Sequence, residues 1–332
     1  MATTTSTSTG ISQRTNVYAE RKMLKYAMPH LVLERFGMPQ IMPQNKSATI
    51  KWRRPVTFDA ATTALAEGVT PTSTVFSYED VEATLRQYGM VVEITDVIED
   101  THEDPVLRNV TKQVGDNIGR TLEQLNYAVV RAGTNVLYAN GTARNQVNTP
   151  LTQTLLRKAV RILKRQKAKK LTEVLGSSPD YGVLPIEPAY VAVIHVDLES
   201  DVRNLPGFLD CSKYATKNKV HEHEFGSVEE VRFVCSADLL PFADAGATAN
   251  GMVSTTGTNA DVYPMMIFGE ESWAHVALRG MDSVSPSIIP VNQKTKDDPL
   301  GQRGYCGFKT YHAAAILNDL WMIRTEVGAT DL

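Results

Sequence analysis

Several features that would assign this chain of 332 residues to a familiar class are scarce or missing. Its three cysteines, Cys211, Cys235 and Cys306, are too few and odd in number for a disulfide framework. No run approaches the ~18 apolar residues of a membrane span, and the Thr- and Ser-rich start lacks the basic and apolar regions of a signal peptide. The net charge of −3 excludes a strongly basic nucleic-acid binder.

The common catalytic and nucleotide-binding motifs are missing as well. There is no P-loop, no strand-linked G-x-G-x-x-G and no G-x-S-x-G elbow. The best metal candidate is the run His-Glu-His-Glu at 221–224, in which His221 and His223 would share one face of a strand. A structural zinc site needs about four ligands and no companion pair is visible, so we predict a solvated strand end. We expect no catalytic residue, no cofactor and no metal.

Two alternating segments predict a long hairpin. Residues 47–54 alternate polar and apolar side chains, and a second strand covers about 78–97, with a change of parity near Gln87 that indicates a bulge. The Thr- and Ala-rich connection has no helical period, yet it carries apolar and aromatic residues that a lone subunit would expose: Phe58, Val75, Phe76 and Tyr78. Because an isolated hairpin is only marginally stable in water, this arm needs something to lie against.

A long helix follows the Asp-Pro pair at 104–105, which suits a helix start. Apolar residues from Leu107 to Val136 recur at steps of three or four and predict about 30–35 residues, roughly 45–50 Å. Gly115 and Gly119 lie inside this helix, at a cost of about 1 kcal/mol each relative to Ala. They indicate either bending and tight packing within the subunit or close approach by another chain.

A second, basic helix is predicted from Thr149-Pro150 to about Lys170. Eight of the fourteen residues from 157 to 170 are Lys or Arg. Such a run is often a solvated face, and the alternatives are contact with an acidic surface of a neighbouring subunit or with nucleic acid. The candidates for an electrostatic contact are Arg157, Lys164, Lys167 and Lys169.

The second half of the chain mixes strands with one short helix. Apolar runs predict strands over 189–196, 228–234 and 262–278, and a short helix covers 197–205. Residues 308–317 and 320–327 predict two strands joined by a tight turn at Asn318-Asp319. No internal sequence repeat is evident.

Several short runs, in the order of these elements, resemble one known family. They are Leu-Ala-Glu-Gly-Val-Thr-Pro at 65–71, Asp-Val-Arg-Asn-Leu-Pro-Gly-Phe at 201–208, Gly-Ser-Val-Glu-Glu-Val-Arg-Phe-Val at 226–234, Val-Tyr-Pro-Met-Met-Ile-Phe-Gly at 262–269 and Asp-Pro-Leu-Gly-Gln-Arg-Gly-Tyr at 298–305. Together they resemble the major capsid proteins of tailed double-stranded DNA bacteriophages with the Hong Kong 97-like fold, in the N4-type branch. None of the runs is a catalytic motif.

The resemblance implies an α+β fold with a defined division of the chain. Its parts would be an N-arm at 1–45, an extended hairpin or E-loop at 46–95, a peripheral domain with a long spine helix at 96–185, an axial domain at 186–290, and closing strands at 291–332 that return to the peripheral domain. It also implies intersubunit contacts through Phe58, Glu67, Val75, Phe76, Tyr78, Gly115 and Gly119.

The function implied is that of a structural protein and not an enzyme. Hexamers and pentamers would assemble into an icosahedral virion shell around packaged DNA, after synthesis in the host cytoplasm. Some relatives carry an N-terminal scaffolding domain; about 45 residues before the hairpin leave no room for one, so we expect a separate scaffolding protein beside a portal and a decoration protein. The alternatives are an encapsulin-like nanocompartment shell or, from another class, a metal-dependent enzyme using His221 and His223.

Overall fold

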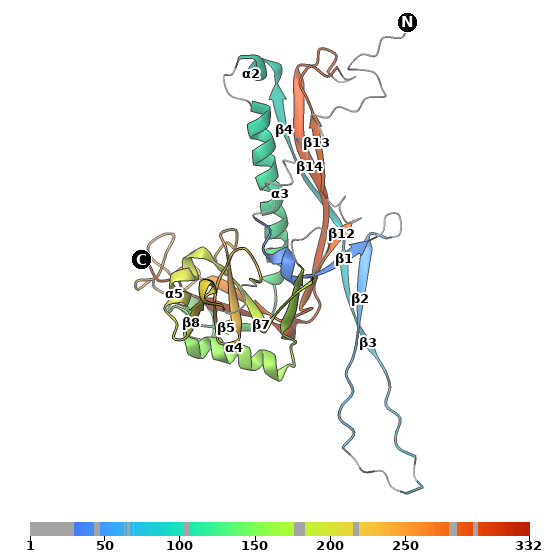
Figure 1. The fold of residues 1–332 in the computed structure, drawn as a ribbon, viewed down its shortest axis with the longest axis vertical. Helices are drawn as coiled ribbons and strands as arrows, with labels where there is room; N and C mark the ends of the chain where they lie inside the picture. Colours follow the sequence, from blue (N-terminus) through green and yellow to red (C-terminus); the bar gives the residue numbers. More distant parts are fainter. Residues whose placement is uncertain are drawn as a thin grey trace.

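The computed structural model (Figure 1) describes residues 30–332 except 43–46, 63, 65–66, 69, 102–105, 176–182, 215–218, 279–283 and 295–297. An elongated part, built of a long helix beside a sheet, rises above a rounded α/β part, and a slender two-stranded arm projects alongside (Figure 1). Most of the predicted N-arm, including all of residues 1–29, lies outside the described residues.

A five-stranded sheet forms the elongated part. Its centre is β14 (Arg303–Ile316), which pairs antiparallel with β4 (Arg86–Thr95) along one edge. The other edge is shared by β13 (Val284–Ile289) and β12 (Trp273–Leu278). Finally, β1 (Met38–Met42) pairs parallel with β12, so the described part of the predicted N-arm joins the sheet.

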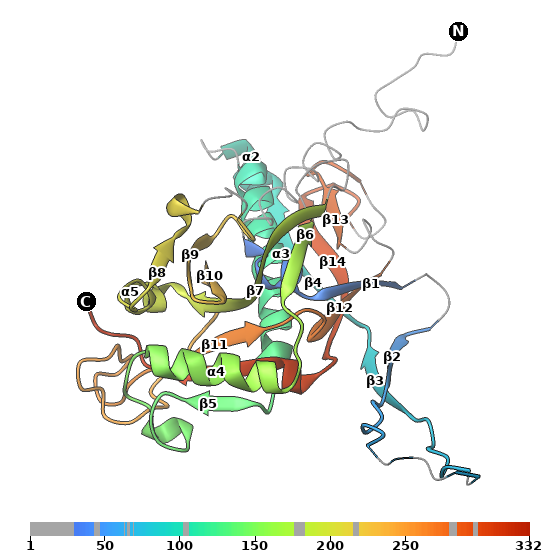
Figure 2. The ribbon, with the colours of Figure 1, turned by 60° about the horizontal axis from the view of Figure 1, so that its bottom comes forward.

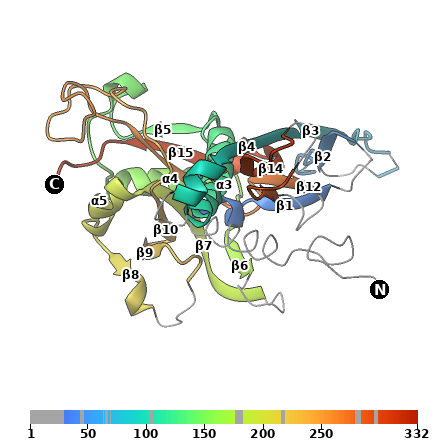
Figure 3. The same ribbon diagram turned by 90° about the horizontal axis from the view of Figure 1, so that it is seen from above.

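The long helix α3 (Val106–Val130) lies along this sheet (Figures 1 and 3). Its apolar stripe buries Val114 and Ile118, which pack with Cys306 and Phe308 of β14. A one-turn helix, α2 (Asp96–Thr101), precedes it at the end of the elongated part. Exposed polar residues alternate with this stripe, so the predicted helical periodicity is confirmed.

The predicted length of this helix is wrong. It has 25 residues and is therefore about 37 Å long. Val136, the last position of the periodic pattern, begins β5 (Val136–Tyr138), which pairs parallel with β15 (Met322–Val327). Gly133 lies between α3 and β5, where a Cβ would come within 2.7 Å of Met322 Cε. A long-range strand pairing overrides the local pattern.

An eight-stranded sheet forms the rounded part. Its order is β5, β15, β11 (Tyr263–Phe268), β7 (Val183–His195), β10 (Val231–Ser236), β9 (Glu224–Val228) and β8 (Phe208–Asp210), with β6 (Leu171–Leu175) also paired to β7. The basic helix α4 (Gln153–Arg165) crosses this sheet (Figure 2) and buries Leu156 and Leu163 with Tyr190 and Phe233. The predicted apolar strand at 189–196 is confirmed as the end of β7.

The basic helix is shorter than predicted. Thr152, and not Thr149, is its N-cap, and the Thr152 hydroxyl accepts a hydrogen bond from the Leu155 N–H at 3.3 Å. The helix ends at Arg165 because Lys167 takes a left-handed conformation with φ 53°. Lys169 therefore lies on the extended segment that leads into β6 and not on the helix.

Short helical segments complete the fold. These are η2 (Leu33–Phe36), η3 (Arg144–Gln146), η4 (Val196–Leu198), α5 (Glu199–Arg203), η5 (Cys211–Lys213) and η7 (Asp319–Trp321). The pair η4 and α5 confirms the helix predicted at 197–205.

Three strand predictions need correction. The range 228–234 contains a tight turn, because Glu229 has φ 53° and connects β9 to β10. The range 262–278 contains two strands that belong to different sheets. The predicted closing hairpin is wrong, because β14 pairs with β4, β12 and β13 whereas β15 pairs with β11 and β5. The segment at Asn318 and η7 is a crossing from one sheet to the other.

The prediction of a solvated strand end at 221–224 is also wrong for two of its four residues. His221 is 8% exposed and Glu224 is 2% exposed. Glu224 accepts hydrogen bonds from the Val220 N–H at 2.5 Å and from the Tyr214 hydroxyl at 2.9 Å. Burial lowers the pKa of His221 to about 4. The run is therefore a packed element of the rounded part.

Candidate intersubunit surface

The most exposed apolar side chains lie on the two-stranded arm. Its strands, β2 (Thr49–Pro55) and β3 (Tyr78–Thr84), pair antiparallel from Thr49↔Thr84 to Pro55↔Tyr78. The second strand predicted over about 78–97 divides at Leu85 into β3, which pairs with β2, and β4, which pairs with β14. The bulge predicted near Gln87 is therefore wrong, because the pairing of β4 with β14 shows no register shift there. We call residues 49–84 the hairpin arm; it projects away from both larger sheets (Figure 1).

Aromatic residues of the hairpin arm form a cluster in solvent. Phe58, Phe76 and Tyr78 are 58%, 50% and 54% exposed. The ring centroids of Phe58 and Phe76 lie 5.9 Å apart, and Phe76 meets Tyr78 edge-on at 4.6 Å. Val75 beside them is 85% exposed. The structure thus brings these four predicted contact residues together on one projection.

Ion pairs connect the two strands of the hairpin arm, β2 and β3. Lys51 Nζ lies 2.6 Å from Glu82 Oε1, and Arg53 Nε lies 3.0 Å from Asp80 Oδ1. The hydrogen bond from the Arg53 guanidinium lowers the pKa of Asp80. Arg53 also sits 5.5 Å from the centroid of the Tyr78 ring. Exposed pairs of this kind contribute only ~0–1 kcal/mol each, so they set the register of the arm more than its stability.

The other predicted intersubunit residues fall at different places. Glu67 is exposed in the turn at the tip, beside Gly68 with φ 74°. Gly115 and Gly119 lie on the buried face of α3, which packs on β14 of the same chain. Their small size therefore serves packing inside the subunit, and we leave both out of the surface proposed below.

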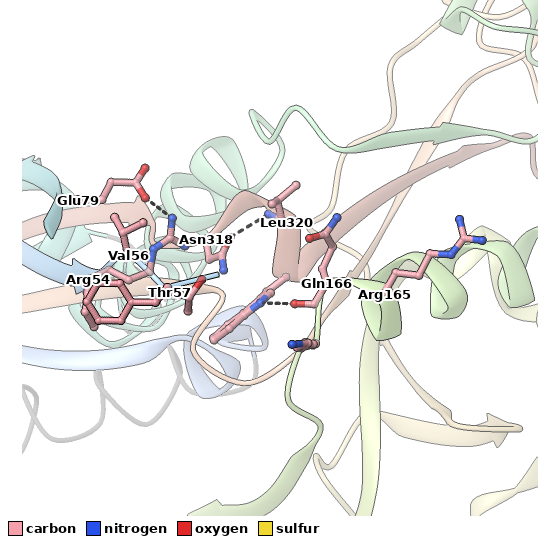
Figure 4. A pocket seen from close by; sticks show the side chains of 12 residues that line it. Arg54, Val56, Thr57, Glu79, Arg165, Gln166, Asn318 and Leu320 are labelled. Atoms are coloured by element: carbon pink, nitrogen blue, oxygen red, sulfur yellow. Dashed lines mark hydrogen bonds and ion pairs between the residues drawn. The ribbon is translucent and has the colours of Figure 1, made fainter. Parts of the chain in front are cut away.

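A groove lies at the root of the hairpin arm (Figure 4). Its volume is about 470 Å³, and three parts of the fold line it: both strands of the hairpin arm at 54–58 and Glu79, the end of α4 and the residues after it at 165–167, and the crossing segment at 318–321. The indole N–H of Trp321 donates to the Gln166 carbonyl at 3.1 Å and ties two of these segments together. Val56 and Leu320 point into it with 47% and 50% of their surface exposed.

The predicted basic residues divide into paired and unpaired groups. Arg157 lies 2.6 Å from Glu229, and Lys164 lies 2.5 Å from Glu230, both in the turn between β9 and β10. The hydrogen bond to Arg157 lowers the pKa of Glu229. Over the part of the chain that the structure describes, no carboxylate lies within ion-pair distance of five others: Lys158, Arg161, Arg165, Lys167 and Lys169.

Sequence reasoning missed the groove residues and one buried acid. Leu320 and Trp321 were assigned to a hairpin strand, and no sequence signal marks the exposed position of Leu320. Glu123 on α3 is fully buried and accepts the backbone N–H groups of Val32 and Leu33 at 3.1 Å. Its position four residues after Gly119, on the buried stripe, could have marked it.

The described residues contain no gathered metal site and no membrane-crossing helix. No group of three or more His, Cys, Asp or Glu side chains comes together among them as a metal site would require. None of their helices is both long and apolar enough to span a membrane.

Comparison with known proteins gives one consistent result. A family model described as phage capsid protein matches residues 78–325. The capsid of Ralstonia phage GP4 aligns with a TM-score of 0.67 at 12% identity, covering 91% of this chain and 92% of that chain. The cyanophage Pam1 capsid aligns with a TM-score of 0.62 at 13% identity over 100% of both chains. The head structure of Helicobacter pylori bacteriophage KHP40 aligns with a TM-score of 0.58 at 10% identity, covering 89% and 88%. No curated protein matches. The predicted α+β capsid fold is confirmed.

Proposed function

We propose that the hairpin arm is the segment through which one subunit binds the next, because this chain belongs to the phage capsid protein family, whose members are structural shell proteins and not enzymes. The observation that supports this most directly is the aromatic cluster of Phe58, Phe76 and Tyr78, half exposed on a projection with no core of its own. Monomeric proteins rarely expose such clusters unless another surface covers them.

The energetic argument scales with the number of subunits. Full burial of a large apolar side chain contributes about 1.5–3 kcal/mol, and each of these rings is roughly half exposed. Covering each ring on a neighbour then contributes about 1 kcal/mol or slightly more. Three rings in each subunit, repeated around a closed ring of subunits, favour the assembled shell strongly.

The finer parts of the proposal concern the layout of the shell. We assign the chain to the N4-type branch of the Hong Kong 97-type capsid proteins, with subunits arranged as hexamers and pentamers. The N-arm, E-loop, peripheral and axial domains take the residue ranges given in the sequence analysis. In this proposal the virion shell encloses double-stranded DNA, contacts it without sequence preference, and is assembled in the host cytoplasm with a separate scaffolding protein, a portal and a decoration protein.

The family match also bears on the alternatives. The three solved structures compared above are those of phage capsids and heads, and they support a phage shell over an encapsulin-like nanocompartment. A metal-dependent enzyme at His221 and His223 is set aside, because the family is structural and His221 is packed beneath the surface.

The test distinguishes a loss of intersubunit contact from a loss of subunit folding. Phe58→Ser/Phe76→Ser should leave circular dichroism and subunit solubility unchanged, because both side chains lie in solvent in the subunit. Negative-stain electron microscopy should then show no shells, whereas the control Thr72→Ser/Thr74→Ser in the same arm should assemble normally. A second variant, with a short Gly-Ser turn in place of 58–76, should behave like the double Phe variant. Normal particles from either Phe-lacking variant would contradict the proposal, as would unfolding of the subunit.

A further inference from the structure

We infer that the groove at the root of the hairpin arm is a second binding site for a neighbouring copy of this chain. The groove would bind an apolar side chain of that copy that is flanked by carboxylates. This inference rests on the proposed function, because the neighbour held by the arm is the molecule that meets the root of the arm. Three observations support it: the apolar lining, its continuity with the aromatic cluster, and the charge of the rim.

The lining of the groove is mixed, and several of its apolar side chains are exposed. Val56, Phe58 and Leu320 are 47%, 58% and 50% exposed, and all three line the same hollow of about 470 Å³. Trp321 forms part of the wall, fixed by its hydrogen bond to the Gln166 carbonyl. A single large side chain of a partner fits a hollow of this size and would cover these residues together.

The groove and the aromatic cluster form one continuous strip. Phe58 lines the groove and at the same time contacts Phe76, which contacts Tyr78 further along the arm. A partner that covers the cluster therefore approaches the groove along the same strip. Because the lining comes from three segments that meet only in the folded chain, the groove is already formed in the subunit.

The cationic rim of the groove favours an acidic partner. Arg54 is paired with Glu79, but Arg165 and Lys167 have no carboxylate within ion-pair distance among the residues that the structure describes. Residues 157–170 hold eight cations and no carboxylate, while the whole chain has a net charge of −3. The rest of the chain therefore carries −11, so a second copy presents the complementary sign.

A nucleic acid is a poorer occupant for the same groove. Phosphates could pair with Arg165 and Lys167, but they would leave Val56 and Leu320 in water. A protein surface that combines a carboxylate with an apolar side chain satisfies both parts of the lining. Among protein partners, the continuity with the arm favours a second copy over an unrelated chain.

The experiment uses full-length subunits with three matched variants. Leu320→Gln removes the apolar contact, and Arg165→Glu/Lys167→Glu reverses the rim. The control Lys158→Glu/Arg161→Glu makes the same charge change on α4, outside this groove. Shell yield is measured by sedimentation and electron microscopy over a range of NaCl concentrations, with melting temperature as the check on folding.

Both groove variants should lower shell yield about tenfold at low salt while melting like the wild type, and the control should assemble like the wild type. The rim variant should also flatten the salt dependence of assembly. Groove variants that assemble normally, while Phe58→Ser/Phe76→Ser fails, would overturn this inference and leave the proposed function standing. Normal assembly of all these variants would overturn both. A rim variant that lost only duplex-DNA binding, or failed only with scaffolding protein present, would identify another occupant and overturn the inference.

Discussion

Replacing Glu123 tests how Val32 and Leu33 are anchored to the long helix α3. The Glu123 carboxylate is fully buried on α3 and accepts the N–H groups of Val32 and Leu33 at 3.1 Å. Val32 and Leu33 are themselves buried, so no water can replace the acceptor. One side chain thus satisfies the start of η2 from a position about 90 residues away in the sequence.

The expected cost follows from the donors that would be left unpaired. Glu123→Leu deprives two buried N–H groups of their acceptor, at about 1–3 kcal/mol each, so unfolding should become easier by about 2–6 kcal/mol. Glu123→Gln keeps one carbonyl acceptor and should lose about half as much. Urea denaturation followed by circular dichroism measures both, with Glu99→Gln on the exposed α2 as the control. A Leu variant as stable as the wild type would refute the reasoning.

The same residue predicts a pH dependence. Burial raises the pKa of Glu123 from 4.5 to about 8, against the two backbone hydrogen bonds that lower it. Between these pH values the folded chain holds a proton that the unfolded chain has released, so the contribution of Glu123 to stability falls as pH rises from about 4.5 to about 8. Glu123→Gln cannot titrate and should show a flatter pH profile of the urea midpoint. An identical slope in the two proteins would contradict this account.

Two further substitutions probe the packing of the rounded part. Gly226→Ala places a Cβ 2.4 Å from the Phe208 ring and 2.8 Å from a backbone carbonyl, so it should destabilise the fold by about 1–3 kcal/mol in the same denaturation assay; an unchanged urea midpoint would contradict the close packing. Glu326→Gln should cost about 2–4 kcal/mol, because this fully buried carboxylate accepts from Arg144 at 2.7 and 2.8 Å, and an unchanged melting temperature would show the pair to be dispensable.

Local periodicity predicted the elements whose burial repeats along the chain. The helix at 106–130 buries one regular stripe of positions, so its spacing identified it. The strand ending at His195 buries every residue from 189 to 194, and its continuous apolar composition identified it. The hairpin arm was predictable for the opposite reason. Its connection has neither period nor core composition, and the exposed Phe58 and Phe76 follow from that.

Partner choice between strands was not predictable from spacing. Residues 308–317 and 320–327 are two apolar segments separated by Asn-Asp, which favours a hairpin on local grounds. In the fold each finds a longer partner elsewhere: β14 pairs with β4 over ten residues, and β15 pairs with β11 over six. These long strand pairings stabilise the fold more than a two-residue hairpin turn would, and no local sequence pattern predicts them. The groove was missed for the same reason, since Leu320 lines it only because the hairpin does not form.

The hairpin arm is also the reason why we expect assembly and folding to be separable in this chain. A lone two-stranded ribbon is marginally stable, and the ion pairs across β2 and β3 add little because they are exposed. Its aromatic rings bury only about half of their surface in the single subunit, so about half of their burial energy is not used there. This part of the burial energy is therefore still available when a neighbour arrives. Substitutions at Phe58 and Phe76 should accordingly act on assembly, whereas those at Glu123 act on the subunit itself.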